Sequence, residues 1–239
     1  MIPLSAAKLL NVWDQGADAP PYRKALLLLA AAYPEQSIEE MGRLSIGRRD
    51  GMLMELRNGL FGAEVDAIVG CPVCGEVLEL NFSLTDLQSP PAPFDSLLLE
   101  SGTYFARFRL PNSIDFEEVA AYPETARTRL LERCALSLSD QDRECSLSEL
   151  PEELKQEVIS RMDEADPQAN IQLALNCSGC GHSWSAPFDI VSFLWREIEA
   201  LVMQLFREIH LLARAYHWSE AEILGMSARR RRQYLEMIT

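Results

Sequence analysis

Apolar side chains recur at steps of three and four residues through residues 1–62 and again through residues 188–239. This spacing places the side chains on one face of an α-helix. Ser37, followed three residues later by Glu40, has the arrangement of a capping box at a helix start. The pattern therefore predicts an N-terminal helical region at 1–62 and a C-terminal helical region at 188–239.

The most regular helical pattern covers residues 188–216, where large apolar residues alternate with charged ones. It predicts one long amphipathic helix. A capping box at Ser219 and a cap at Ser227 predict two short helices after it. The apolar stripe is either core or, in part, a candidate partner-binding surface, since the small ribbon of cysteine-bearing strands described below cannot cover all of it. The candidate residues are Leu194, Trp195, Ile198, Leu201, Leu205, Ile209, Tyr216, Trp218 and Tyr234.

Strands are predicted where apolar and polar residues alternate. V-L-E-L-N-F (77–82) has this pattern, and so does Y-F-A-R-F-R-L-P within residues 103–111. Helical spacing predicts helices at 115–138 and 151–163. The acidic stretch 139–153 is expected to be a surface loop.

Two segments of the chain resemble each other. I-V-G-C-P-V-C-G-E-V-L-E-L-N-F and A-L-N-C-S-G-C-G-H-S-W-S-A-P-F each place C-x-x-C-G between two short strands. We interpret residues 63–89 and 171–187 as the two halves of one ribbon, with an α/β segment, 90–170, inserted between them. The predicted fold class is α+β, mostly helical.

The cysteine spacing predicts a metal site. Cys71, Cys74, Cys177 and Cys180 form two C-x-x-C pairs, and four thiolates suit tetrahedral Zn²⁺. A Cys₄ shell leaves no open coordination position, so the expected ion is one structural Zn²⁺. The alternatives are two metal-free pairs, inert or disulfide-bonded, and a site in which His182 replaces one cysteine.

Composition narrows the function classes. The chain has 239 residues and a formal net charge of −14, which argues against general binding to nucleic acid or anionic membranes. The longest apolar run, Ala25 to Tyr33, is too short to span a bilayer, and we expect neither a signal peptide nor membrane insertion. No catalytic motif or convergent acid–base pair is present, so no catalytic or small-molecule-binding residues are predicted.

Two charged segments have two interpretations each. L-S-I-G-R-R-D-G (44–51) is either a docking loop or a helix start. The basic run Arg229 to Arg232 favours a helix-face contact or a contact with a protein partner, with a nucleic-acid contact as the alternative. Of the two remaining cysteines, Cys134 is expected to be buried and Cys145 to lie in a loop.

Several sequence motifs resemble one family. They are F-D-I-V-S-F-L-W-R-E-I-E (188–199), R-E-I-H-L-L-A-R-A-Y-H-W-S-E-A-E-I-L (207–224), R-R-R-Q-Y-L-E (230–236) and, upstream, L-S-I-G-R-R-D-G-M-L-M-E-L-R with C-P-V-C-G and C-S-G-C-G-H-S-W. Together they are similar to the T4-type phage baseplate proteins associated with the central hub and its assembly. They match most closely the zinc-bearing version found with phage-like contractile injection systems.

This resemblance implies a non-enzymatic component or assembly chaperone of a baseplate hub, in a phage tail or a phage tail-like particle. The implied partners are baseplate, hub or spike proteins. The implied location is the cytoplasm during assembly, with retention in the finished particle left open. The alternative function is a zinc-ribbon adaptor for nucleic acid or the transcription machinery. Stoichiometry, the exact partner and the role of residues 90–170 stay open.

Overall fold

The computed structural model describes residues 1–90, 96–141 and 143–238. The chain is α+β and mostly helical, as predicted, and it divides into two compact units. Unit 1 comprises Met1–Gln36 and Val191–Thr239, and unit 2 comprises Ser37–Ile190. Among the described residues, no helix combines the length and the hydropathy that crossing a membrane requires.

Unit 1 consists of helices only within its described part. They are α1 (Ala6–Gly16), α2 (Pro21–Ala32), α9 (Ile190–Tyr216), α10 (Glu220–Leu224) and α11 (Ala228–Glu236). The indole of Trp195 packs so closely on Gly16 that a Cβ there would lie 2.3 Å from a ring carbon. The capping box predicted at Ser219 is present at the start of α10.

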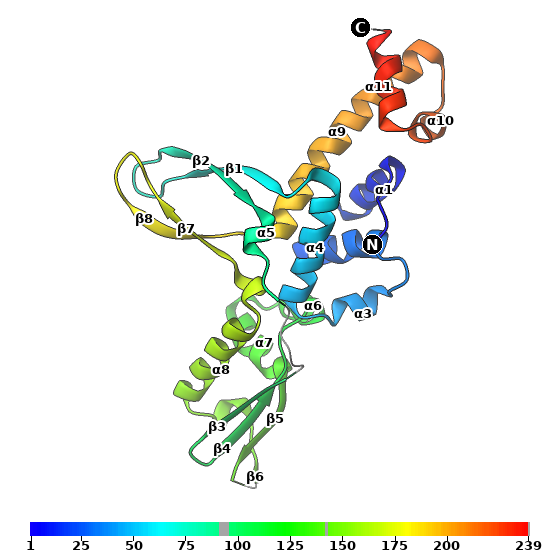
Figure 1. Ribbon diagram of the computed structural model, residues 1–239. Helices are drawn as coiled ribbons and strands as arrows, with labels where there is room; N and C mark the ends of the chain where they lie inside the picture. Colours follow the sequence, from blue (N-terminus) through cyan, green and yellow to red (C-terminus); the bar gives the residue numbers. More distant parts are fainter. Residues whose placement is uncertain (91–95, 142, 239) are drawn as a thin grey trace. The chain divides into compact units, whose positions relative to one another are not determined.

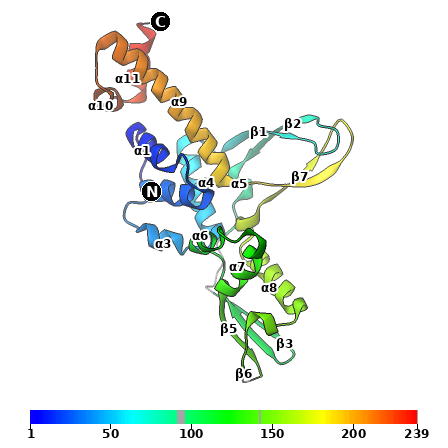
Figure 2. The same ribbon diagram turned by 180° about the vertical axis from the view of Figure 1, so that it is seen from behind.

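The C-terminal helices pack against the end of α9, as Figures 1 and 2 show from opposite sides. Arg231 of α11 is buried and donates to Glu208 of α9 at 2.9 Å and to the Met226 carbonyl at 2.8 Å. Tyr216 stacks on Trp218 with ring centroids 4.5 Å apart, and Tyr234 meets Trp218 edge-on. A buried ion pair and an aromatic cluster therefore hold this end of the unit together.

Unit 2 begins with α3 (Ile38–Gly42) and α4 (Ile46–Phe61). The Ser37–Glu40 capping box is confirmed at the start of α3, and Gly62, with φ +90°, ends α4. Two antiparallel hairpins follow at separate places in the sequence. The first is β1 (Glu64–Gly70) with β2 (Val77–Ser83), and the second is β7 (Gln172–Asn176) with β8 (Ser183–Pro187). We call residues 64–83 and 172–187 the ribbon.

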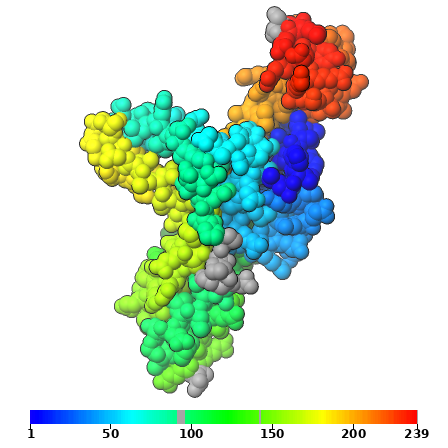
Figure 3. Space-filling view, in the orientation of Figure 1, coloured from blue at the N-terminus to red at the C-terminus, as the bar shows by residue number. Residues whose placement is uncertain are grey.

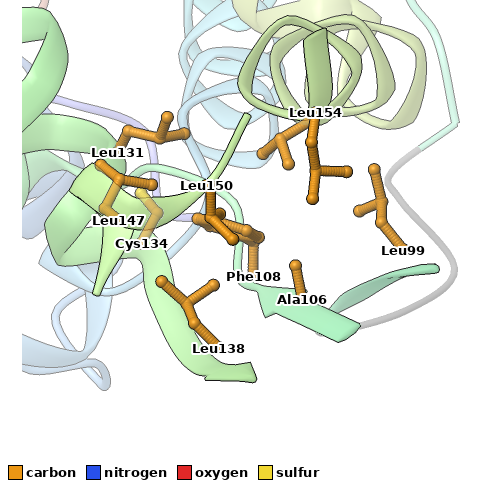
Figure 4. Close-up of a cluster of buried hydrophobic side chains, with 10 residues drawn as sticks. Leu99, Ala106, Phe108, Leu131, Cys134, Leu138, Leu147, Leu150 and Leu154 are labelled. Atoms are coloured by element: carbon orange, nitrogen blue, oxygen red, sulfur yellow. The ribbon is translucent and has the colours of Figure 1, made fainter. Parts of the chain in front are cut away.

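The segment between the hairpins has its own sheet and core. A four-stranded antiparallel sheet has the order β3 (Leu97–Ser101), β4 (Tyr104–Phe108), β5 (Ala135–Asp140), β6 (Arg143–Glu144). Helices α7 (Ala126–Cys134) and α8 (Glu152–Ala165) contribute to its buried cluster (Figure 4). We call this cluster the insertion core. Its ten residues are Leu99, Ala106, Phe108, Leu131, Cys134, Leu138, Leu147, Leu150, Leu154 and Val158.

Short elements complete the segment: α5 (Leu84–Leu87), α6 (Ser113–Val119) and the 3₁₀ turns η1 (Pro123–Thr125), η2 (Leu147–Glu149) and η3 (Pro167–Asn170). Buried Asp115 of α6 accepts hydrogen bonds from Arg109, after β4, and from Arg133 of α7. Burial alone raises the pKa of Asp115. These donors, with the Asn112 amide, more than offset that effect, so the pKa lies below its usual range.

Two expectations for this segment were wrong. Residues 115–138 are not one helix, because α6 ends at Val119 and α7 ends at Cys134, where the chain enters β5. The stretch 139–153 is not only a loop, because it contains the end of β5, β6 and η2. Leucines that continue the helical spacing concealed the alternation in A-L-S-L-S-D (135–140), whose Leu138 packs into the insertion core.

Candidate metal centre

The two C-x-x-C turns have the same backbone construction. The Cys71 amide donates to the Glu76 carbonyl at 2.8 Å, and the Cys177 amide donates to the His182 carbonyl at 2.8 Å. Each turn is closed by a glycine amide that donates 2.9 Å to the carbonyl of its first cysteine. Those glycines, Gly75 and Gly181, have φ values of +76° and +73°, a conformation that disfavours residues with a Cβ. The repeat seen in the sequence is thus a structural repeat.

The four sulfurs of the two turns lie together at the ribbon tip. All of them fall within 4.8 Å of one another, although Cys74 and Cys177 are 103 positions apart in the sequence. Two of these approaches cross between the hairpins: Cys71 Sγ to Cys180 Sγ at 3.7 Å and Cys74 Sγ to Cys177 Sγ at 3.6 Å. Figure 3 shows the yellow surface of the second hairpin against the cyan-green surface of the first.

These distances fit a metal tetrahedron better than a disulfide. Four Zn–S bonds of about 2.3 Å in a regular tetrahedron place the sulfurs about 3.8 Å apart. A disulfide requires about 2.05 Å, and all four cysteines are free thiols. Cys71 and Cys177 are buried, whereas Cys74 and Cys180 are exposed. The group can therefore hold a metal ion at a site where two of the four cysteines are exposed to solvent.

The thiols interact strongly with one another and with the backbone. The Cys74 amide, followed by the Val73 amide, lowers the pKa of the Cys71 thiol to about 7. The Glu76 amide lowers the pKa of Cys74, but the sulfurs of Cys180 and Cys177 raise it, with a net value of about 12. The turns thus stabilise a first thiolate, and proximity opposes the next ones unless a cation lies between them.

A second contact links the hairpins at the end away from the sulfurs. The Phe82 and Phe188 rings meet edge-on with centroids 5.6 Å apart. The His182 ring, considered as an alternative ligand, stacks on Trp184 at 5.8 Å. Among the described residues, the ligand atoms that gather closely enough for a metal are the four sulfurs.

Comparison with known protein families identifies the chain. Residues 22–195 match the family described as T4 bacteriophage base plate protein. The chain belongs to this family. As a baseplate-family protein it has a structural role in a phage baseplate, and its cysteine group is compatible with a bound metal. No curated protein and no solved structure matches it.

The family match ends at Trp195. The motifs at 207–224 and 230–236 that contributed to the resemblance therefore lie beyond the matched residues. Both C-x-x-C pairs and the segment between them lie inside the match. The ribbon is thus embedded in the baseplate-family part of the chain.

The segment 44–51 of this baseplate protein is a helix start, not a docking loop. Arg49 and Asp50 are 6% and 8% exposed and pair at 2.6 Å. The Gly47 amide donates to Asp166 at 2.9 Å, and a Cβ on Gly47 would lie 1.9 Å from that carboxylate. Burial raises the pKa of Asp50 to about 6, although Arg49 opposes the rise. Close packing on Asp166 and Gln168 therefore explains the glycine at position 47, and the Arg49–Asp50 pair accounts for two of the charges.

The candidate partner residues, which lie on α9, at Trp218 just beyond it and on α11, divide into two groups. Leu194, Trp195, Ile198 and Leu205 are at most 3% exposed, so they belong to the interior of the folded chain and are not available to a partner. Leu201, Ile209, Tyr216, Trp218 and Tyr234 are half-buried. The other cysteines are as expected: Cys134 is buried, and Cys145 lies beyond β6.

Proposed function

We propose that this chain is a non-enzymatic structural component or assembly chaperone of the baseplate hub, in a phage tail or a related contractile injection system. We further propose that Cys71, Cys74, Cys177 and Cys180 hold one structural Zn²⁺. The observation that carries the proposal is the four-sulfur group inside a baseplate-family chain. Hub, spike or other baseplate proteins are the proposed partners.

The donor set supports zinc over the common oxygen-preferring ions. Four thiolates at these spacings suit a soft, tetrahedral cation, and oxygen-preferring Mg²⁺ or Ca²⁺ would not select them. Zn²⁺ would hold the ribbon closed, and it leaves no coordination position for a substrate. The ribbon also carries carboxylates, Asp66, Glu76 and Glu79, which speaks against a nucleic-acid adaptor.

The test combines assembly with metal analysis. The gene would be deleted in a producing strain, and particles would be purified and imaged. We expect particles without complete baseplates, and rescue by a tagged copy. The tagged protein should co-purify with baseplate proteins and carry about one zinc per chain.

Mass spectrometry of mature particles would separate a permanent component from a chaperone that leaves. Normal particles after deletion would refute the baseplate role. Recovery of nucleic acid or polymerase subunits in place of baseplate proteins would favour the adaptor function.

A further inference from the structure

Helix α9 has a second face, opposite its buried stripe. Residues 196, 200, 203, 207, 210 and 214 follow steps of four and three, and all of them are exposed. Met203 is 43% exposed, and Leu211, next to His210 in the sequence, is 41% exposed. We call this set the outer face; it consists of Arg196, Ala200, Met203, Arg207, His210, Leu211 and Arg214.

The outer face is basic and contains no carboxylate. In the described part of the chain, neither Arg207 nor Arg214 takes part in an ion pair. Nearby carboxylates on α9 are engaged elsewhere, since Glu199 accepts from the Trp195 indole at 3.0 Å and Glu208 binds Arg231. No described carboxylate therefore lies within ion-pair distance of these two arginines.

This basic face belongs to a strongly acidic protein. Unit 2 contains 27 acidic and 12 basic side chains, whereas unit 1 contains 9 acidic and 10 basic ones. An acidic ligand would be repelled by the chain's net charge of −14 and attracted only where cations gather. If an acidic ligand binds, it must therefore bind at a local cluster of cationic side chains, because the net charge of the chain repels it.

We propose that the outer face of α9 binds an acidic amphipathic helix of another protein in the same particle, a proposal that rests on the proposed baseplate function. Alternating steps of four and three are the spacing at which one helix presents a seam to another. Met203 and Leu211 supply adaptable apolar contacts, and the arginine stems extend them. The guanidinium groups pair with carboxylates on the facing helix.

A protein helix fits this surface better than nucleic acid does. The apolar side chains lie between the arginines along the same face, where a phosphate backbone would desolvate them without gain. A second copy of the chain also carries acidic helices, such as α8, and is treated as a distinct outcome of the test.

The experiment uses the full-length protein and a designed probe. The probe is a helical peptide of roughly 21 residues, about 30 Å long, with leucine and glutamate at the facing positions. A matched peptide has glutamine in place of each glutamate. Fluorescence anisotropy would measure both affinities for the wild type, for Arg207→Glu/Arg214→Glu on α9, and for Arg229→Glu/Arg232→Glu on α11. The α11 pair changes net charge equally, at exposed positions off the outer face.

We expect the glutamate peptide to bind the wild type and the glutamine peptide to bind much more weakly. The α9 pair should weaken binding about tenfold or more, and the α11 pair should change it by no more than about twofold. Circular dichroism would verify that both variants remain helical. Absence of binding by the wild type, or equal losses in the two variants, would overturn the proposal.

Two further measurements test which molecule binds the outer face of α9. Analytical ultracentrifugation would measure self-association of the wild type and of the Arg207→Glu/Arg214→Glu variant. If the wild type self-associates and the variant does not, a second copy of the chain binds the outer face, and the proposal is overturned. A photo-crosslinker at Met203 in producing cells should capture an acidic helix of another particle protein. Capture of nucleic acid there would also overturn it.

Genetic complementation separates this proposal from the baseplate role. If deletion abolishes complete particles and the α9 pair restores them fully, the docking surface is wrong and the baseplate role stands. If deletion leaves particles normal, the baseplate role itself is wrong.

Discussion

The ribbon and the insertion core belong to the same unit but bury very different numbers of side chains. The structure describes every ribbon residue, and only Val65, Cys71 and Cys177 among them are buried. The insertion core buries ten, including fully buried Phe108 and Val158. A segment with so little buried apolar surface needs a cross-link, whereas a packed core does not. The comparison indicates that the four-sulfur group, once it holds the proposed Zn²⁺, takes the place of a core in the ribbon.

Loss of one cysteine ligand should have the largest effect, and it should affect the ribbon but not the insertion core. In Cys71→Ser or Cys177→Ser we expect zinc content to fall and the protein to aggregate, because structural zinc contributes on the order of 10 kcal/mol. Hydrogen exchange should rise in 64–83 and 172–187 but not in the insertion core. Metal analysis and exchange mass spectrometry would measure both.

The matched control is Cys145→Ser, which removes a half-buried thiol outside the sulfur group. It should keep its zinc. Full zinc retention in both ligand variants would refute the shared site.

Truncation of a side chain in the insertion core should destabilise the insertion and leave the zinc content unchanged. Phe108→Ala removes a fully buried ring and should destabilise the insertion by about 3–5 kcal/mol, with zinc retained. Chemical denaturation with metal analysis would test this. Phe105→Ala, in the same strand but 43% exposed, is the control and should change stability far less. Zinc loss in Phe108→Ala would show that the two parts depend on each other.

The pairing of Asp115 should add a smaller, pH-dependent contribution. Its lowered pKa means that the ionised carboxylate stabilises the fold above the unfolded pKa of about 3.9, and that this stabilisation is lost as pH falls through the folded pKa. Asp115→Asn should reduce stability by about 2 kcal/mol at pH 7, since its arginine partners are partly exposed.

Denaturation curves of both proteins should converge as the pH drops below about 4. Glu117→Gln, on the exposed side of the same helix, is the control. A difference between wild type and Asp115→Asn that does not vary with pH would contradict the ion-pair explanation.

The glycines of the C-x-x-C turns should give the smallest effects. Gly75→Ala and Gly181→Ala meet no atom within 4 Å, so only the positive φ opposes them, at about 1–2 kcal/mol each. Competition with a zinc chelator should show weaker metal retention in both. Gly70→Ala, also in open space but without positive φ, should match the wild type. Unequal effects at the two turns would argue against their equivalence.

The sequence predicted those features that depend on local chemistry. Capping boxes at Ser37 and Ser219 need only residues three apart, and the C-x-x-C-G repeat needs only one turn. The change from α7 to β5 was missed because it depends on Leu138 packing into a core assembled from distant residues.

The structure also limits which residues of the apolar stripe on α9 a partner could reach. Its most apolar positions, such as Leu194 and Ile198, are the interior of the folded chain. The charged side of the same helix is the exposed one. Hydrophobic periodicity finds the buried face of a helix, and the exposed face needs a structure.

The separation of Cys74 from Cys177 has a consequence for the order of events during synthesis. The first two ligands emerge from the ribosome 103 positions before the third, so the site is completed only after the intervening segment has been made. Closing a loop of that length in an unfolded chain opposes metal binding by about 4–5 kcal/mol. Prior folding of the insertion core shortens the effective loop and removes much of that penalty. Capture of the proposed Zn²⁺ would then be a late step, favoured once the middle of the chain has folded.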